Sequence, residues 1–199
     1  MDALVCAQLN TQHCKAAMAH LSLCLTHNNI DILFNQEPYC YNGTPSLFPS
    51  NYTPFYVNTD NEPRASLFIR NDIAHNFILL HNFSTPDNII VVTSSNPPIY
   101  IASSYFPPYN TLEQDLSPIE TFLNSVKPPH LIWGLDSNSH HSLWYNPTTD
   151  ARGRILVDFL SQQGLITANE KDRPTFSGAL GESWIDLTVT TTNLAHRVQ

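Results

Sequence analysis

The chain has 199 residues, 42% of them hydrophobic, and it carries nine Lys and Arg against 17 Asp and Glu, for a net charge of −8. Its length and apolar content indicate one folded domain over 1–199 and argue against a disordered chain. The acidic balance argues against a protein that holds nucleic acid by charge alone. It is compatible with an enzyme that uses a divalent cation, because the metal supplies local positive charge.

No apolar run of the sequence reaches transmembrane length, and residues 1–8 lack the segments of a secretory signal. The four cysteines at positions 6, 14, 24 and 40 show no zinc-like spacing. Cys6 falls in a strand-like apolar run, and Cys14 and Cys24 fall in a helix-like one. We therefore expect an intracellular protein with no membrane partner and with buried free thiols rather than disulfides.

The first third of the chain predicts a strand, a helix and a second strand. Residues 3–10 form an apolar run that ends at Asn10, and residues 13–27 carry apolar side chains at three- and four-residue steps. Residues 30–38 form a second apolar run, which ends in Glu37 before a proline. This order predicts a parallel strand pair, so Asn10 and Glu37 should meet at one edge of a sheet.

The middle of the chain predicts a long loop followed by short strands. Residues 39–63 are rich in Tyr, Asn and Pro and are expected to form the loop. The β-branched and aromatic content then predicts antiparallel strands at 65–70, 77–80, 89–94 and 99–105. The last of these strands ends at Tyr105.

The second half predicts two further helices. Apolar periodicity places one helix over 112–126, ahead of an apolar strand that begins at residue 131. Thr149-Asp150 predicts the cap of another helix, which Gly164 closes at its C-terminal end. The last predicted strands are 175–176 and 183–189. No internal repeat or linker is present.

The segment 131–141 carries the densest group of polar side chains. Its apolar run stops at Gly134, and Asp136, Asn138, His140 and His141 follow. In a strand, Asp136 and Asn138 would point the same way, so that a carboxylate and an amide lie side by side. The alternative is an ordinary Asx-rich turn.

Polar groups at strand ends are the candidate site. They are Asn10, Glu37, Tyr105, Asp136 with Asn138, and Asp186. Each has an ordinary alternative, since Glu37 can be a strand-end charge, Tyr105 a packing residue and Asp186 a solvent-facing strand residue. Oxygen ligands without a set of Cys or His favour Mg²⁺ or Mn²⁺ over zinc.

Taken in order, these segments resemble the endonuclease/exonuclease/phosphatase superfamily over most of the chain. The motifs that carry the resemblance are Leu9-Asn10, Gln36-Glu37-Pro38, Ser104-Tyr105-Phe106-Pro107-Pro108, Gly134-Leu135-Asp136-Ser137-Asn138 and Ser183-Trp184-Ile185-Asp186. Finer signs are similar to the endonuclease domains of non-LTR retrotransposons, especially target-specific elements of arthropods. These signs are Gln36-Glu37-Pro38-Tyr39, Tyr105-Phe106-Pro107-Pro108, Asn138-Ser139-His140-His141 with Trp144, Thr149-Asp150-Ala151-Arg152-Gly153, Pro174-Thr175-Phe176 and Ser183-Trp184-Ile185-Asp186-Leu187.

The resemblance implies an α/β fold, a four-layer sandwich of two mixed β-sheets flanked by helices, with its last strands missing. It implies a Mg²⁺ ion, or Mn²⁺, held by Glu37 with Asn10 nearby. Asp136 would orient or deprotonate the attacking water, and Tyr105 would stabilise charge on the phosphate or the leaving oxygen. Asp186 would orient a histidine. The substrate would be bound by Asn10, Asn138 and Thr175.

The activity implied by the resemblance is the nicking of double-stranded target DNA, which primes reverse transcription. A reverse transcriptase domain would follow in the same polyprotein, and the protein would be nuclear during target cleavage. A phosphoinositide or nucleotide phosphatase of the same superfamily and an inactive binding remnant are the alternatives.

One motif of the superfamily is not found. A Ser-Asp-His motif is expected a few tens of residues after 183–187, and the sequence reaches Gln199 without it. His196 lacks the preceding Ser-Asp, so we do not expect it to be the catalytic base. The expectation is therefore a C-terminally truncated domain, either a fragment of a longer reading frame or a decayed copy, with nicking activity barely above background.

Overall fold

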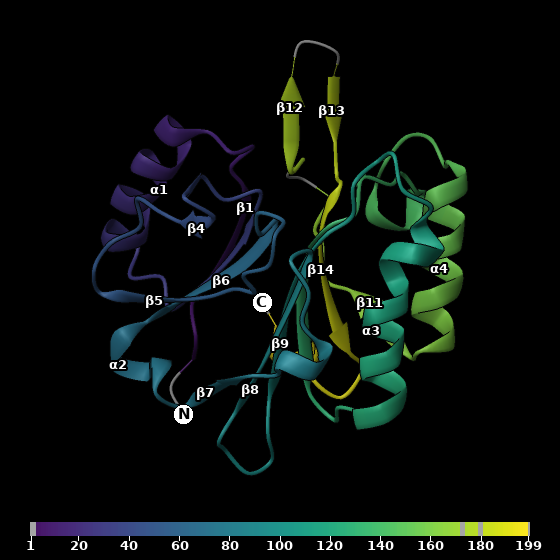
Figure 1. Cartoon of the computed structure of the whole chain (residues 1–199). Helices are drawn as coiled ribbons and strands as arrows, with labels where there is room; N and C mark the ends of the chain where they lie inside the picture. Colours follow the sequence, from purple (N-terminus) through teal and green to yellow (C-terminus); the bar gives the residue numbers. More distant parts are fainter. Residues whose placement is uncertain (1–2, 172–173, 179–180, 199) are drawn as a thin grey trace.

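Two β-sheets pack face to face in the computed structural model, and helices cover their outer faces (Figure 1). The structure describes residues 3–171, 174–178 and 181–198. One sheet has the strand order β1 (Cys6–Asn10), β2 (Ile32–Gln36), β6 (Ala65–Arg70) and β5 (Tyr52–Phe55). The other has the order β11 (Leu165–Thr167), β14 (Asp186–Thr191), β10 (Leu131–Asp136), β9 (Tyr100–Tyr105), β8 (Asn88–Thr93) and β7 (Phe77–Leu79). The predicted four-layer α/β sandwich is confirmed.

The first sheet starts with the predicted strand–helix–strand unit. Helix α1 (Lys15–His27) connects β1 to β2, and the two strands pair in parallel with Asn10 opposite Gln36. The prediction that 39–63 is only a loop is wrong, because it contains the edge strand β5 and the short strands β3 (Cys40–Tyr41) and β4 (Thr44–Pro45). The proline inside β5 hid this strand from pattern analysis, although an edge strand tolerates proline.

The second sheet combines a meander with a crossover. Strands β7, β8 and β9 pair antiparallel in sequence order, as predicted. The short helix α2 (Asn71–Ala74) and the turn η1 (His81–Phe83) flank β7. Helix α3 (Leu112–Val126) then carries the chain over to β10, which pairs in parallel with β9.

Helix α4 (Ala151–Gln162) follows a further turn, η2 (Ser142–Trp144). The predicted cap is confirmed, since the Asp150 carboxylate accepts a hydrogen bond from the Gly153 N–H at 2.6 Å. Gly164 lies just after the helix with a φ of +65°, a conformation that glycine adopts without strain. The helices α3 and α4 both lie on the outer face of the second sheet (Figure 1).

The predicted strand 183–189 is wrong as a single element. Strand β13 (Gly181–Ser183) pairs with β12 (Phe176–Gly178) in a hairpin that projects away from both sheets (Figure 1). A new strand, β14, begins at Asp186 and joins the second sheet beside β10. The break matters because it places Asp186 at the start of a sheet strand. The described chain then reaches the turn η3 (Ala195–Arg197).

Apolar side chains fill the space between all layers. Ile32, Leu67, Ile89 and Ile101 pack between the two sheets, and Trp133, Phe122 and Leu156 belong to the cluster under α3 and α4. Within the described residues, none of the helices has the length and apolar character needed to cross a bilayer.

The cysteines are free, as predicted, but the expectation that they are buried is wrong. Cys6 and Cys14 are exposed, and Cys24 and Cys40 are partly exposed. The reason is their position in the fold, since β1 is an edge strand and Cys14 immediately precedes α1.

Candidate active site

The pairing register of the strands brings the predicted polar side chains to one edge of the sandwich. Asp136, the last residue of β10, lies opposite Tyr105 of the parallel strand β9 and opposite Asp186 of the antiparallel strand β14. Asn10 ends β1, and Glu37 follows β2 in the other sheet. All seven predicted site residues line one cavity of about 530 Å³, and they are Asn10, Glu37, Tyr105, Asp136, Asn138, Thr175 and Asp186.

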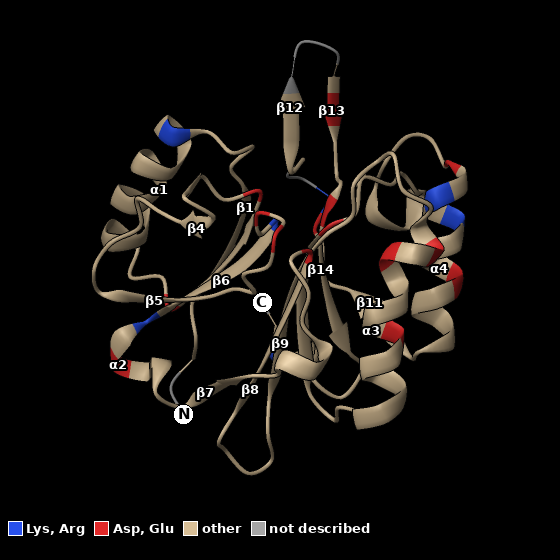
Figure 2. Cartoon of the chain, in the orientation of Figure 1, with Lys and Arg blue, Asp and Glu red and all other residues tan. Residues whose placement is uncertain are grey.

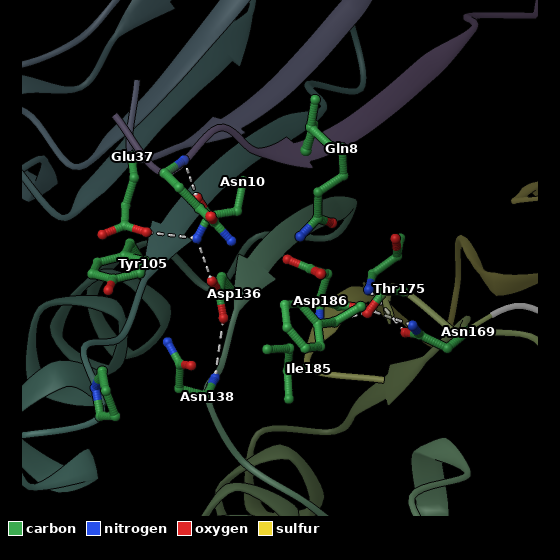
Figure 3. A pocket seen from close by; sticks show the side chains of 15 residues that line it. Gln8, Asn10, Glu37, Tyr105, Asp136, Asn138, Asn169, Thr175, Ile185 and Asp186 are labelled. Carbon is green, nitrogen blue, oxygen red and sulfur yellow. Dashed lines mark hydrogen bonds between the residues drawn. The ribbon is translucent and has the colours of Figure 1, made fainter. Parts of the chain in front are cut away.

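Asn10 connects the two sheets within this cavity. Its Nδ2 donates hydrogen bonds to Glu37 Oε2 at 2.8 Å and to Asp136 Oδ2 at 2.7 Å (Figure 3). Its Oδ1 accepts a bond from the Gln12 N–H at 2.7 Å, which orients the amide. The Asn10 amide therefore lies between two carboxylates, one from each side of the cavity.

Two of the site residues have a backbone conformation that is uncommon for residues other than glycine. The φ angle is +46° at Glu37 and +43° at Asn138. Such conformations cost free energy and persist only where the surrounding structure holds them, often at functional sites.

The predicted strand alternation of Asp136 and Asn138 is wrong, because β10 ends at Asp136. The Asn138 N–H donates to Asp136 Oδ1 at 3.2 Å, and Asn138 Nδ2 donates to the Phe106 carbonyl at 3.2 Å. An Asx turn, the alternative considered from sequence, therefore carries Asn138 into the cavity.

Burial and like charges change the protonation of three groups. Burial raises the pKa of Asp136 to about 6, and the Glu37 carboxylate adds to this, whereas hydrogen bonds from Asn10 and Asn138 oppose it. Burial, together with the Asp136 charge, raises the pKa of Asp186 to about 7. Burial also raises the pKa of Tyr105, and the neighbouring Glu37 carboxylate contributes. The phenol of Tyr105 therefore keeps its proton at neutral pH.

One carboxylate oxygen of Asp186 lacks a hydrogen-bond partner among the described residues. Its Oδ1 is buried and forms no hydrogen bond with any described residue. Its N–H donates to Thr175 Oγ1 at 3.1 Å, which ties β14 to the segment before β12. No histidine is among the described residues that line the cavity, and His140 is held instead by Asp150, at 2.9 Å from its Nδ1.

The donor set fits a hard divalent cation. Glu37, Asp136 and Asp186 place three carboxylates around one cavity, with no cysteine among the lining residues. Within the described residues, no three His, Cys, Asp or Glu side chains are close enough to form a complete cation cage. Mg²⁺ does not need one, because it is usually held by one or two carboxylates, with water and phosphate oxygens completing its shell.

Gln8 and Asn169 are among the cavity residues that sequence reasoning missed. Gln8 was within reach of strand alternation, because it lies two residues before Asn10 in β1; its Nε2 is buried and has no hydrogen-bond partner among the described residues. Asn169 donates to the Asp186 carbonyl at 2.8 Å and accepts from the Thr188 N–H at 3.0 Å. No local pattern marks Asn169, because its role depends on a contact with a distant strand.

Basic side chains are sparse around the site, while acidic ones gather where the strand ends of the two sheets approach each other (Figure 2). Arg64 is an exception. It precedes β6 in the first sheet and bonds Asp87, which precedes β8 in the second, at 2.6 and 2.7 Å. Its guanidinium lies over the ring of Tyr105, 5.5 Å from the ring centroid. Arg64 therefore joins the two sheets next to the site.

The chain is similar to several known proteins. A family model described as endonuclease-reverse transcriptase matches residues 99–199. The RNA-directed DNA polymerase from the mobile element jockey of Drosophila funebris is 28% identical over 163 residues, which are 78% of this chain. The chain spans only 17% of the length of that relative.

Solved structures have the same architecture. The endonuclease domain of TRAS1, a telomere-specific non-LTR retrotransposon, is 27% identical with a TM-score of 0.82, over 95% of this chain and 85% of that one. The AP endonuclease LMAP from Leishmania major is 11% identical with a TM-score of 0.67, over 97% of this chain and 80% of that one. The 3′ phosphatase NExo from Neisseria is 13% identical with a TM-score of 0.67, over 96% and 87% of the two chains. These last two likenesses show the fold alone.

Proposed function

Because this chain belongs to the endonuclease-reverse transcriptase family, we propose that its cavity hydrolyses phosphodiester bonds of double-stranded DNA with the help of a divalent cation. The resemblance to non-LTR retrotransposon endonuclease domains of the endonuclease/exonuclease/phosphatase superfamily is confirmed by the family match, the jockey relative and the TRAS1 structure. The observation that carries the proposed chemistry is the row of Tyr105, Asp136 and Asp186 in one sheet, facing Asn10 and Glu37 of the other.

Glu37 would hold the cation, Mg²⁺ or Mn²⁺, and Asn10 fixes the Glu37 carboxylate by its hydrogen bond at 2.8 Å. When bound, such an ion supplies Lewis-acid stabilisation of the negative charge that develops on the phosphate.

The other residues act on the water and the phosphate. Asp136 has a pKa of about 6, so it is largely ionised at neutral pH and basic enough to orient or deprotonate a water molecule. Tyr105 keeps its proton and donates a hydrogen bond to a charged phosphate or leaving oxygen. The Asn138 amide at the cavity wall holds the scissile phosphate, and Thr175 and Asn10 complete the substrate contacts.

Asp186 remains protonated in part near neutral pH, because its pKa is about 7. In that form it donates a proton or hydrogen bond into the cavity, and in its ionised form it orients a cationic or hydrogen-bonding partner. Both roles are open to Asp186 because its Oδ1 has no hydrogen-bond partner among the described residues.

The polyprotein context is part of the proposal. In the jockey relative the matching region is a small part of an RNA-directed DNA polymerase. We infer that a reverse transcriptase domain accompanies this domain and that the nick it makes in chromosomal DNA provides the primer. That step would place the protein in the nucleus.

The second candidate function is that of a phosphoinositide or nucleotide phosphatase. The 3′ phosphatase from Neisseria is 13% identical, and a likeness at that level supports only the fold. The endonuclease domain of TRAS1 is 27% identical with a higher TM-score, and the family match points the same way. Both similarities support DNA, rather than a phosphoinositide or nucleotide, as the proposed substrate.

Nicking of supercoiled plasmid with Mg²⁺ tests the proposal. The domain is assayed within the polyprotein inferred above, because residues 1–199 alone are expected to nick barely above background. Asp136→Asn should lower the rate by about 10²–10⁴, the usual contribution of a general acid or base. Glu120→Gln, a neutralisation on the exposed face of α3, should leave the rate unchanged. The proposal is refuted if the wild type nicks no faster than Asp136→Asn. If the wild type releases phosphate from a phosphoinositide but does not nick DNA, the phosphatase function is supported instead.

A further inference from the structure

Arg152, in the first turn of α4, makes an unusual number of contacts with backbone carbonyl groups. Its guanidinium donates to the carbonyls of Asn110 at 2.7 Å, Asn138 at 3.1 Å, Ser137 at 3.3 Å and Phe106 at 3.4 Å. The five N–H groups of an arginine have a fixed fork geometry, so one side chain can bind several acceptors at once.

The four carbonyls belong to the two segments that follow β9 and β10. Segment 106–110 continues from Tyr105, and segment 137–141 continues from Asp136. The same Phe106 carbonyl also accepts the hydrogen bond from Asn138 Nδ2 at 3.2 Å. Arg152 therefore contacts both the backbone of Asn138 and the acceptor that orients its side chain.

The neighbours of Arg152 hold the same segments. Asp150, two residues earlier, accepts bonds from the His140 N–H at 3.1 Å and from the Gly153 N–H at 2.6 Å. Gly153 allows this close approach, because a Cβ atom at that position would lie 2.0 Å from the His140 carbonyl oxygen. The first turn of α4 is thus built against the loop that carries Asn138.

The charge of Arg152 has a partner inside the protein. Its Nη2 lies 3.5 Å from Asp115 Oδ2, and only 17% of the Arg152 side chain and 7% of the Asp115 side chain are exposed. Asp115 in turn accepts a hydrogen bond from Asn110 Nδ2 at 2.9 Å. Arg152 is therefore held in place from α3 as well, and its charge is not available to bind DNA from solvent.

We propose that Arg152 is a positioning residue, which holds Asn138 in its left-handed conformation at the cavity wall by binding the carbonyls of segments 106–110 and 137–141. The proposal rests on the proposed function, because it assigns to Arg152 the placement of the group that binds the scissile phosphate. A neutral side chain cannot bind the four carbonyls together, and a lysine replaces the fork with a single donor group.

The matched control is Arg154, two residues further along α4. It is exposed, and among the described residues its side chain bonds only the Thr149 carbonyl, at 3.5 Å. Arg152→Gln, Arg152→Lys and Arg154→Gln are compared with the wild type by hydrogen–deuterium exchange and by plasmid nicking with Mg²⁺. Arg152→Gln should speed exchange in 106–110 and 137–141, Arg152→Lys should do so less, and Arg154→Gln should leave these segments unchanged.

In the nicking assay, Arg152→Gln should lower kcat by about 10- to 100-fold, the loss expected when a binding group moves by up to about 1 Å. Combined with Asn138→Ala, it should lower kcat less than about twofold further, because both substitutions disable the same contact. A purely structural role would instead give losses that multiply.

The two measurements separate the inference from the proposed function. Unchanged exchange in both segments, or losses that multiply with Asn138→Ala, would overturn the role of Arg152. If the wild type does not nick DNA, the proposed function fails, and the exchange measurement still decides whether Arg152 holds the two segments in place.

Discussion

Asp186→Asn should stabilise the protein at alkaline pH in the absence of metal, although it removes a group of the candidate site. The pKa of Asp186 rises from its usual value of 3.8 to about 7 because of burial and the Asp136 charge. At about 1.4 kcal/mol per pKa unit, ionised Asp186 costs the fold about 4 kcal/mol. The new amide NH₂ must also find an acceptor, at a cost of about 1–3 kcal/mol. A net gain of about 2 kcal/mol remains.

The sign of the pH dependence follows from proton binding. Because the folded-state pKa of Asp186 is raised, the folded protein binds more protons than the unfolded chain between pH 3.8 and about 7. Its stability therefore falls as the pH rises through this window, and the full penalty is present above it. The asparagine variant lacks this dependence, so its advantage should be large at about pH 8 and close to zero at about pH 5.

Urea unfolding in EDTA at these two pH values measures the effect. A gain of about 2 kcal/mol corresponds to a Tm higher by about 4–8 °C for a domain of this size. Asp158→Asn, on the exposed side of α4, is the control and should change neither curve. An equal gain at both pH values, or none at the higher one, would refute the assignment of a buried, repelled carboxylate at Asp186.

With Glu37→Gln, the rise in Tm that Mg²⁺ gives the wild type by mass action should disappear; an equal thermal shift would remove Glu37 from the cation site. Leu156 is fully buried, so Leu156→Ala should lower the free energy of unfolding by about 2–5 kcal/mol in urea titrations, and the partly exposed Ile132 should cost less on the same change. Equal losses of stability for Leu156→Ala and Ile132→Ala would contradict the observed difference in burial between the two side chains. A double-mutant cycle between Arg64 and Asp87 should show a coupling of about 1 kcal/mol, because their ion pair joins the two sheets and is about one quarter exposed. A coupling of zero would mean that the pair does not hold the sheets together.

Much of the fold was readable from local patterns. The apolar spacing predicted α3 with its observed bounds, and Asp150 and Gly164 predicted the ends of α4. Helix periodicity and capping residues act within a few positions of the chain, so they are visible without the rest of the protein. Strand β5 was missed because Pro54 interrupts its residue pattern, and only its pairing with β6 shows that it is an edge strand.

In the candidate site, too, some features could be predicted from local sequence and others could not. The side chains to consider could be recognised from local sequence, because polar residues at the ends of apolar runs stand out, and all seven predicted residues line the cavity. The position of Asp136 opposite both Tyr105 and Asp186 became visible only in the folded chain, since strand register depends on residues far apart in the sequence. It also decided the raised pKa values and the role of Arg152, because burial and contacts between loops exist only once the two sheets and their helices have packed together.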